Sequence, residues 1–464
     1  MTLLTENVPD LATGSLFRFA TAGSVDDGKS TLVGRLLHDS KSVLADQLDA
    51  VERASAERGF GGAAVDGVQQ LDLALLTDGL RAEREQGITI DVAYRYFATA
   101  KRSFILADCP GHVQYTRNTV TGASTADAVV VLIDARKGVL EQTRRHLAVA
   151  RLLRVPHLIA AVNKIDLVDY SEARFRSVEA ELQRAAAELG ETSLTVVPVS
   201  ALRGDNIVNR SERTPWYAGP SLLEILERLP SLTDLETGSE SFRFPVQTVI
   251  RPQGALAPGL DPDEYRDYRG YAGQIVAGTV RVGDAVAVLP GERTTVVSAI
   301  DAAGEQLDEA FAPQSVVLRL REDLDIARGD LIAEAGTHGG SSRDIQASLC
   351  WLSPKALEPG SLVLIKHGSS TVRGRISEIL GRLDLDTFTD QPAARLGLND
   401  IGTVRLRVAS PLPVDAYAAS RHTGSFLVID PGDGNTLAAG LVTGSDPASV
   451  GPAGARSAGG PDVS

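Results

Sequence analysis

The chain has 464 residues, of which 43% are hydrophobic and 23% are charged, enough for two or three globular domains. Its formal charge of −14 argues against a broad nucleic-acid-binding surface, because such surfaces place Lys and Arg on phosphates. The start has neither the basic nor the apolar region of a secretory signal, and the apolar run at 128–133 is too short to cross a membrane. We therefore expect a cytoplasmic protein with neither a membrane nor a nucleic-acid partner.

An amino-terminal extension at 1–16 precedes a region, 17–235, in which short β-rich apolar runs alternate with helical patterns. The apolar runs lie at 17–23, 103–108, 128–135, 157–164 and 194–200, and helical patterns lie at 142–153 and 171–189. This alternation predicts an α/β domain, in which a mostly parallel sheet is covered by helices on both faces.

After about residue 235, the sequence pattern changes to short predicted strands separated by Gly and Pro turns. Such spacing predicts antiparallel β-barrels, and a break in the Gly-rich stretch near 334–344 divides them into domains at 240–335 and 340–443. The segment 444–464 is rich in Gly, Pro, Ala and Ser, so we expect it to be disordered. The predicted fold is thus multidomain, with an α/β domain followed by two β-barrels.

The stretch GSVDDGKST, between an apolar strand and a helical pattern, fits a phosphate-binding loop. Gly23 and Gly28 let backbone N–H groups turn inward around phosphates, while Lys29 reaches the β and γ oxygens and Ser30 offers a hydroxyl to Mg²⁺. The alternative, a glycine loop that merely joins strand to helix, is less consistent with the full pattern. The residues expected to surround the phosphates are Gly23, Ser24, Val25, Asp26, Asp27, Gly28, Lys29, Ser30 and Thr31.

Two further segments carry candidates for sensing the γ-phosphate. Asp108 opens the stretch Asp108, Cys109, Pro110, Gly111 and His112 directly after an apolar strand, where its carboxylate can hold Mg²⁺ through water or, alternatively, cap the next helix. Gly111 can approach the phosphate closely because it has no side chain. Thr89, in EREQGITID, can add a hydroxyl to Mg²⁺ when the γ-phosphate is present, unless it is only an exposed strand-start residue.

The base pocket is predicted at Asn163, Lys164 and Asp166, again at the end of an apolar strand. The Asp166 carboxylate can accept hydrogen bonds from N1–H and the exocyclic amine of guanine, whereas adenine would leave it unpaired. Asn163 and Lys164 can brace the loop and cover the ring, although these four letters alone also fit a helix cap. A third loop, at Ser200, Ala201 and Leu202, can present backbone N–H to guanine O6, so the sequence predicts a GTP site.

The order and spacing of these segments resemble those of the translation-factor GTPases, such as elongation factor Tu and elongation factor 1-alpha, from about Phe17 to Val442. The resemblance implies a GTPase in which His112 positions the attacking water, and a histidine beside the γ-phosphate can do so without being a strong base. It also implies GTP and Mg²⁺ as ligands.

Within that class, the chain closely resembles the GTPase subunits of bacterial heterodimeric sulfate adenylyltransferases. The sequences that carry this resemblance lie at 23–37, 71–97, 111–146 and 268–284. This resemblance implies a partner, a small catalytic subunit of the PP-loop type that joins ATP and sulfate into adenosine 5'-phosphosulfate and pyrophosphate. GTP hydrolysis by this chain would drive that uphill reaction. In some relatives the large subunit continues into a kinase with its own P-loop, and this sequence contains no second such loop, so we expect no kinase activity.

Two alternatives share the same nucleotide residues. An aminoacyl-tRNA carrier of the elongation-factor type is disfavoured by the aspartate pair at 26–27 and by the absence of an evident basic, aromatic stripe for RNA. A free-standing regulatory GTPase would differ only in its partner surfaces. The segment 253–267 departs from the family pattern, because it lies as an insertion where the family has a short link.

Overall fold

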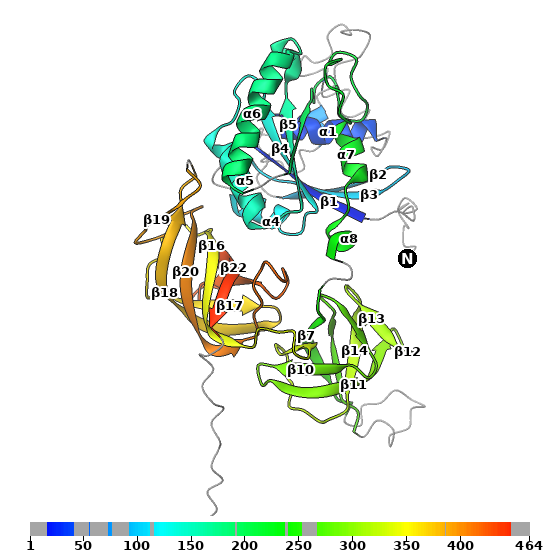
Figure 1. Ribbon diagram of the computed structural model, residues 1–464, viewed down its shortest axis with the longest axis vertical. Helices are drawn as coiled ribbons and strands as arrows, with labels where there is room; N and C mark the ends of the chain where they lie inside the picture. The colour runs from blue at the N-terminus through cyan, green and yellow to red at the C-terminus, as the bar shows by residue number, and fades with distance from the viewer. Residues whose placement is uncertain are drawn as a thin grey trace, which may run out of the picture. The chain divides into compact units, whose positions relative to one another are not determined.

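The computed structural model describes residues 16–40, 55, 73–76, 92–111, 116–190, 193–236, 240–252, 267–385 and 387–446 (Figure 1). The chain divides into two compact units, one dominated by residues 1–235 and the other by residues 236–383 and 390–464. Among the described residues, none of the helices combines the length and apolar composition that crossing a bilayer requires.

The amino-terminal unit is built on a six-stranded sheet with the order β2-β3-β1-β4-β5-β6. Its strands are β1 (Leu16–Gly23), β2 (Ala93–Ala98), β3 (Ser103–Asp108), β4 (Ala128–Asp134), β5 (His157–Asn163) and β6 (Leu194–Pro198). Neighbouring strands are parallel except β2 and β3, which run antiparallel. Every residue of β4 is buried, as expected for a central strand that is covered on both faces.

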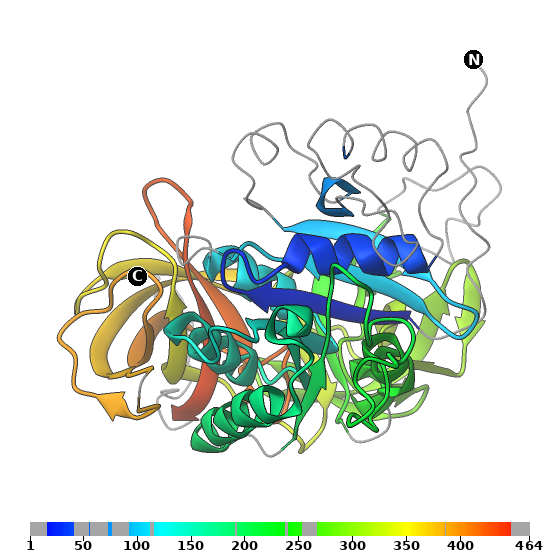
Figure 2. The same cartoon turned by 90° about the horizontal axis from the view of Figure 1, so that it is seen from above.

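Helices cover both faces of this sheet. They are α1 (Lys29–Asp39), α4 (Thr116–Ala123), α5 (Glu141–Leu152), α6 (Glu172–Glu188), α7 (Leu222–Arg228) and α8 (Leu232–Glu236), with short 3-10 helices η1 (Leu73–Leu76) and η3 (Ile165–Val168). Leucines of α1 and α7 share one apolar core with Phe17, Phe19 and Phe104 of the sheet. Figure 2 shows α1 on one side of the sheet and α5 and α6 on the other.

The first β region after this unit closes into a barrel. Its strands are β7 (Arg243–Ile250), β8 (Gly270–Gln274), β9 (Thr279–Arg281), β10 (Ala285–Leu289), β11 (Arg293–Ala302), β12 (Glu305–Leu307), β13 (Glu309–Phe311), β14 (Ser315–Leu320) and β15 (Leu331–Glu334). The main sheet has the order β10-β15-β7-β8-β14-β11-β12, and an extra pairing of β10 with β11 completes the ring. All of these pairs are antiparallel, and the ring encloses its own apolar core.

The second β region closes in the same way. Its strands are β16 (Ser342–Trp351), β17 (Leu362–His367), β18 (Ser370–Leu383), β19 (Asp390–Gln391), β20 (Ile401–Leu412), β21 (Ser425–Ile429) and β22 (Thr436–Asp446). The order is β17-β21-β22-β16-β20-β18-β19, with β17 and β18 also paired. A parallel-sheet domain followed by two antiparallel barrels confirms the predicted fold class.

The two barrels, which belong to one compact unit, are joined by a buried ion pair. Arg243 in the first strand of the first barrel places its Nε 2.9 Å from Asp415 Oδ2 in the second barrel, and both side chains are largely buried. The Thr423 hydroxyl donates a second hydrogen bond to the same carboxylate oxygen at 2.6 Å. Although burial raises the pKa of Asp415, the hydrogen bonds from Arg243 and Thr423 hold it below its ordinary value.

Candidate nucleotide-binding site

The predicted phosphate loop lies between the end of β1 and the start of α1. Gly28, the residue before the helix, has φ 92° and ψ 28°, a left-handed conformation that favours glycine. A Cβ on Gly28 would lie 2.5 Å from Asn163 Nδ2, so space also restricts this position. The first turn of α1 contains no acidic residue, which leaves its N–H groups suited to an anion.

Asp27 closes the loop on itself. Its Oδ2 accepts a hydrogen bond from Ser24 N at 2.7 Å, and burial raises the pKa of this carboxyl. Asp27 Oδ1 and Ser24 Oγ are buried without a hydrogen-bond partner among the described residues. Buried polar atoms are normally satisfied, so orphaned atoms beside this loop are consistent with a site whose ligand supplies partners.

The Lys29 side chain is hydrogen-bonded to the backbone of the same loop. Its Nζ donates hydrogen bonds to the Gly23 carbonyl at 2.8 Å and to the Ser24 carbonyl at 2.9 Å. Burial lowers the pKa of Lys29, and the nearby Asp108 carboxylate opposes that shift. A Cβ on Gly111 would clash with Lys29 Nζ and lie 2.7 Å from the Gly23 carbonyl oxygen. The two segments therefore pack so closely that only glycine fits at position 111.

Asp108 ends β3 with a buried carboxylate. Its Oδ1 accepts a hydrogen bond from Thr21 Oγ1 at 2.8 Å, across the β1–β3 pairing that sets Thr21 opposite Asp108. Ser30 lies in the first turn of α1, beside the buried Lys29. The donor set of one hydroxyl and one carboxylate next to a cradle that a Cβ would fill fits a nucleotide-bound magnesium ion.

The structure says less about the other residues predicted to surround the phosphates and the magnesium ion. Val25, Asp26 and Thr31 complete the loop and the helix start, and Cys109 and Pro110 are buried. Cys109 is a free thiol whose pKa is raised by burial. Thr89 and His112 lie outside the described residues.

Asn163 joins the phosphate loop to the third loop of the site. Its Nδ2 donates to the Asp27 carbonyl at 2.7 Å, and its Oδ1 accepts from Ala201 N at 2.9 Å. The side chain is 1% exposed, so both hydrogen bonds are shielded from water. One amide therefore fixes two loops that are distant in sequence.

Lys164 extends this bracing on the outer side of the loop. It has a left-handed φ of 63°, and its Nζ hydrogen-bonds the Asp26 carbonyl and lies 3.1 Å from Asp134 Oδ2. Asp134, which ends β4, also accepts from Arg136 Nη2 at 2.6 Å. Burial raises the pKa of Asp134, but the hydrogen bonds from Arg136 and Lys164 outweigh it and hold the pKa well below its ordinary range.

Asp166 lies in η3, two residues after Lys164. Its half-buried carboxylate accepts no hydrogen bond from another described residue. Ser200 and Ala201 are buried, while Leu202 is 38% exposed. Arg35 of α1 holds this third loop by donating to the Ala201 carbonyl at 3.2 Å and to the Leu202 carbonyl at 2.6 Å. A carboxylate with free acceptors beside fixed backbone is what guanine recognition requires.

The structure adds three residues that the sequence analysis did not assign: Asp134, Arg35 and His146. Asp134 carried a usable signal, because it is a carboxylate at the end of an apolar parallel strand, like Asp108. His146, buried in α5, has its pKa lowered to about 3 by burial and by the charge of Lys29, against a hydrogen bond to the Gly23 backbone. A neutral imidazole thus backs the phosphate loop, and nothing in its helical sequence context indicated this role.

The fold and the site define a P-loop GTPase of the translation-factor class. Residues 15–234 match the family described as the elongation factor Tu GTP binding domain, and residues 344–443 match the GTP-eEF1A C-terminal domain-like family. Among solved structures, the crystal structure of Sup35 complexed with GDP is 24% identical, with a TM-score of 0.40. The match covers 96% of this chain and 97% of that chain.

Relatives identify the family within that class. The bifunctional enzyme CysN/CysC of Mycobacterium tuberculosis (strain ATCC 25618 / H37Rv) is 50% identical over 430 residues, which cover 92% of this chain and 67% of the relative. Sulfate adenylyltransferase subunit 1 of Cellvibrio japonicus (strain Ueda107) is 48% identical over 427 residues, covering 92% of this chain and 86% of the relative. The chain belongs to the sulfate adenylyltransferase subunit 1 family.

Proposed function

We propose that this chain is the GTP-hydrolysing subunit of a sulfate adenylyltransferase. The observation that carries the proposal is the 48% identity, over 92% of the chain, to a relative named sulfate adenylyltransferase subunit 1. The phosphate and base loops support the GTPase part, because Asn163 ties them into one site that leaves the Asp166 carboxylate available to a base.

The phosphates would bind to the loop at 23–31, where the amino-terminal N–H groups of α1 and the Lys29 ammonium meet negative charge. Lys29 would exchange its bonds to the loop carbonyls for bonds to phosphate oxygens. Ser30, Asp108 and Thr89 would hold Mg²⁺, which when bound neutralises charge that develops on the phosphates. The base would be read by Asp166 and by the backbone of 200–202.

The chemical step would use His112 to position the attacking water. Gly111 would sense the γ-phosphate, since it packs against Lys29 and the phosphate loop, and by the resemblance to translation-factor GTPases Thr89 would do the same. Loss of that phosphate on hydrolysis would then change the surface offered to a partner. The change in surface would signal to the partner whether GTP or GDP is bound.

The partner would be a small catalytic subunit of the PP-loop type, which is consistent with the name subunit 1 carried by the relatives. That subunit would join ATP and sulfate into adenosine 5'-phosphosulfate and pyrophosphate. A phosphoric–sulfuric anhydride is much less stable than the anhydride of ATP, so this equilibrium lies far toward ATP. Coupled conversion of GTP and water to GDP and phosphate would draw it forward, within a cytoplasmic pathway of sulfate assimilation.

The elongation-factor alternative shares the fold and the nucleotide site. It is disfavoured because the relatives that match 92% of the chain carry the sulfate adenylyltransferase name. The two hypotheses differ in the ligand bound by the GTP form, which is aminoacyl-tRNA in one case and a protein subunit in the other.

The experiment mixes the purified chain with its small subunit, ATP and sulfate, and measures pyrophosphate and GDP. We expect pyrophosphate release that depends on sulfate, rises with GTP, and rises less with a non-hydrolysable GTP analogue. The chain alone should hydrolyse GTP slowly and form no adenylylsulfate. If GTP leaves the yield unchanged and the chain binds aminoacyl-tRNA tightly, the proposal is wrong and the carrier alternative is correct.

A further inference from the structure

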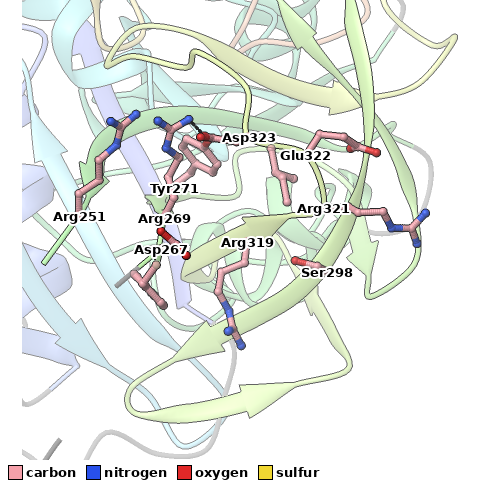
Figure 3. Close-up of a pocket in the computed structure, with 11 residues that line it drawn as sticks. Arg251, Asp267, Arg269, Tyr271, Ser298, Arg319, Arg321, Glu322 and Asp323 are labelled. Carbon is pink, nitrogen blue, oxygen red and sulfur yellow. Dashed lines mark ion pairs between the residues drawn. The ribbon is translucent and has the colours of Figure 1, made fainter. Parts of the chain in front are cut away.

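A polar cavity of about 700 Å³ lies at one end of the first barrel and is lined by four arginines (Figure 3). The strand pairing brings them together. Ile250 at the end of β7 pairs with Gly270 at the start of β8, and Leu318 near the end of β14 pairs with Tyr271. Three neighbouring strand ends therefore meet here, and the arginines Arg251, Arg269, Arg319 and Arg321 lie at or just beyond those ends.

Two of the arginines are held in place by the protein. Arg269 Nη1 donates to the Leu324 carbonyl at 2.7 Å and forms an ion pair with Asp323. Arg319 Nε lies 3.2 Å from Asp301 Oδ2, and its guanidinium lies over the Tyr268 ring, 5.8 Å from the centroid. These contacts fix the cations in the cavity wall before any ligand arrives.

The other two arginines of the lining, Arg251 and Arg321, are available to bind a ligand. Arg251 and Arg321 are exposed, and neither side chain forms a hydrogen bond or an ion pair with another residue in the part of the chain that the structure describes. Guanidinium groups match the oxygens of phosphate and sulfate with paired hydrogen bonds. Figure 3 shows Arg251 and Arg321 at opposite sides of the cavity, so on a chain with a formal charge of −14 each offers a separate contact to a bound anion.

The lining also carries three carboxylates, Asp267, Glu322 and Asp323, which leave it with one net positive formal charge. Glu322 accepts a hydrogen bond from the Thr295 hydroxyl, and Asp267 is exposed at the cavity edge. Asp323, which pairs with Arg269, has a side chain that is 77% exposed. An exposed ion pair contributes little stability, so an incoming anion can replace Asp323 on Arg269 at small cost.

We propose that this cavity binds a tetrahedral oxyanion, sulfate or phosphate, either free or as part of a nucleotide, and that Asp323 competes with it for Arg269. The volume is within the range of small-molecule sites, so it accommodates either source of the anion. The site is separate from the phosphate loop at 23–31, and the proposal holds whether or not the chain drives sulfate adenylylation.

The test uses the full chain saturated with GDP, so that the phosphate loop is filled. Isothermal titration at low ionic strength measures binding of sulfate, inorganic phosphate and ATP, with chloride as the reference anion. The Arg251→Gln and Arg321→Gln double variant should bind on the order of tenfold more weakly, because charged hydrogen bonds are lost. Asp323→Asn should bind several-fold more tightly, because it removes the competing anion.

Matched controls are Arg373→Gln, an exposed arginine of β18 in the other barrel, and Asp308→Asn, an exposed aspartate of this barrel outside the cavity lining. Both should leave binding unchanged. Thermal melting checks that each variant is folded, and if the double variant is destabilised, the opposite effect expected of Asp323→Asn still tests the site.

Tighter binding of sulfate or phosphate than of ATP would identify the free anion as ligand, and the reverse would identify the nucleotide. The proposal is overturned if none of the three binds saturably to the GDP-loaded chain. It is also overturned if Arg373→Gln weakens binding as much as the double variant does, or if chloride competes as well as sulfate, since either result indicates diffuse surface charge.

Discussion

Replacing Asn163 by Ala tests the link between the phosphate loop and the base loops. The wild-type amide is 1% exposed and forms two hydrogen bonds, to the Asp27 carbonyl at 2.7 Å and from Ala201 N at 2.9 Å. The variant removes both and leaves a buried carbonyl and a buried N–H unpaired. We expect the two loops to lose their fixed spacing.

The size of the effect follows from those two hydrogen bonds. Each buried hydrogen bond contributes about 1 to 1.5 kcal/mol net, so their loss should cost about 2 to 3 kcal/mol. If the loops must be re-ordered when the nucleotide binds, that cost appears in the affinity. A loss of this size corresponds to a rise of about 30-fold to 150-fold in the dissociation constant of GDP.

The assay is a titration with a fluorescent GDP analogue, accompanied by urea unfolding of the nucleotide-free protein. Asn206→Ala is the matched control, because Asn206 is equally buried in the same domain. Its Nδ2 donates to the Pro198 carbonyl and to Thr214 Oγ1, both at 2.9 Å, and its Oδ1 accepts from Ser211 N at 2.8 Å. The control should lose stability comparably and keep its GDP affinity within a few-fold of the wild type.

The reasoning is refuted if the two variants lose the same stability and the Asn163 variant still binds GDP within threefold of the wild type. Asn163 would then be a structural core residue without a role in ordering the site. Equal loss of affinity in both variants would also refute it, because the effect would come from general destabilisation.

Four further changes test other parts of the account. Gly111→Ala should lower GTP affinity and hydrolysis by on the order of tenfold or more, because its Cβ would lie 2.7 Å from the backbone carbonyl oxygen of Gly23, and wild-type single-turnover kinetics in the variant would count against this packing. Arg243→Ala should lower the free energy of unfolding by about 3 to 5 kcal/mol, since it leaves the buried Asp415 carboxylate with the Thr423 hydroxyl but without its arginine partner. The lowered pKa of Asp415 means that its contribution is present above about pH 4 and is lost on acidification, so urea unfolding of Asp415→Asn should show a shallower decline from pH 5 to 3. His146, with a pKa of about 3, should cost stability as pH falls below about 6.5, because the unfolded imidazole binds a proton that the folded one does not, and His146→Gln should reduce that slope.

Much of the fold could be predicted from the sequence because its signals are local. The helical pattern at 171–189 corresponds to α6, Glu172–Glu188, which begins where the Ser171 side chain accepts from Arg174 N. The apolar run at 128–135 corresponds to β4, Ala128–Asp134. Pairing such as that of β7 with β15 joins strands that are far apart in the chain, and the sequence of neither strand indicates which partner it pairs with.

The positions of the predicted nucleotide loops follow from local motifs in the sequence, whereas the contacts that connect those loops do not. Glycine spacing and strand-end carboxylates indicate where a nucleotide binds, since each motif lies within a few residues. The bridge from Arg35 to Ala201 and Leu202 joins positions more than 160 residues apart, and it depends on the helix facing that loop. His146 packs behind the phosphate loop for the same reason, so only the folded chain reveals it.

The most direct test of the central claim exchanges the nucleotide that drives the reaction. Asp166→Asn should replace the carboxylate acceptor by an amide, which suits the C2 oxygen of xanthine and not the amine of guanine. In a mixture with the small subunit, ATP and sulfate, we expect the wild type to form adenylylsulfate in response to GTP and not to xanthosine triphosphate. The variant should respond to xanthosine triphosphate and lose its response to GTP. If the variant forms adenylylsulfate with GTP as well as the wild type does, then Asp166 does not read the base and guanine-nucleotide hydrolysis in this site does not drive adenylyl transfer.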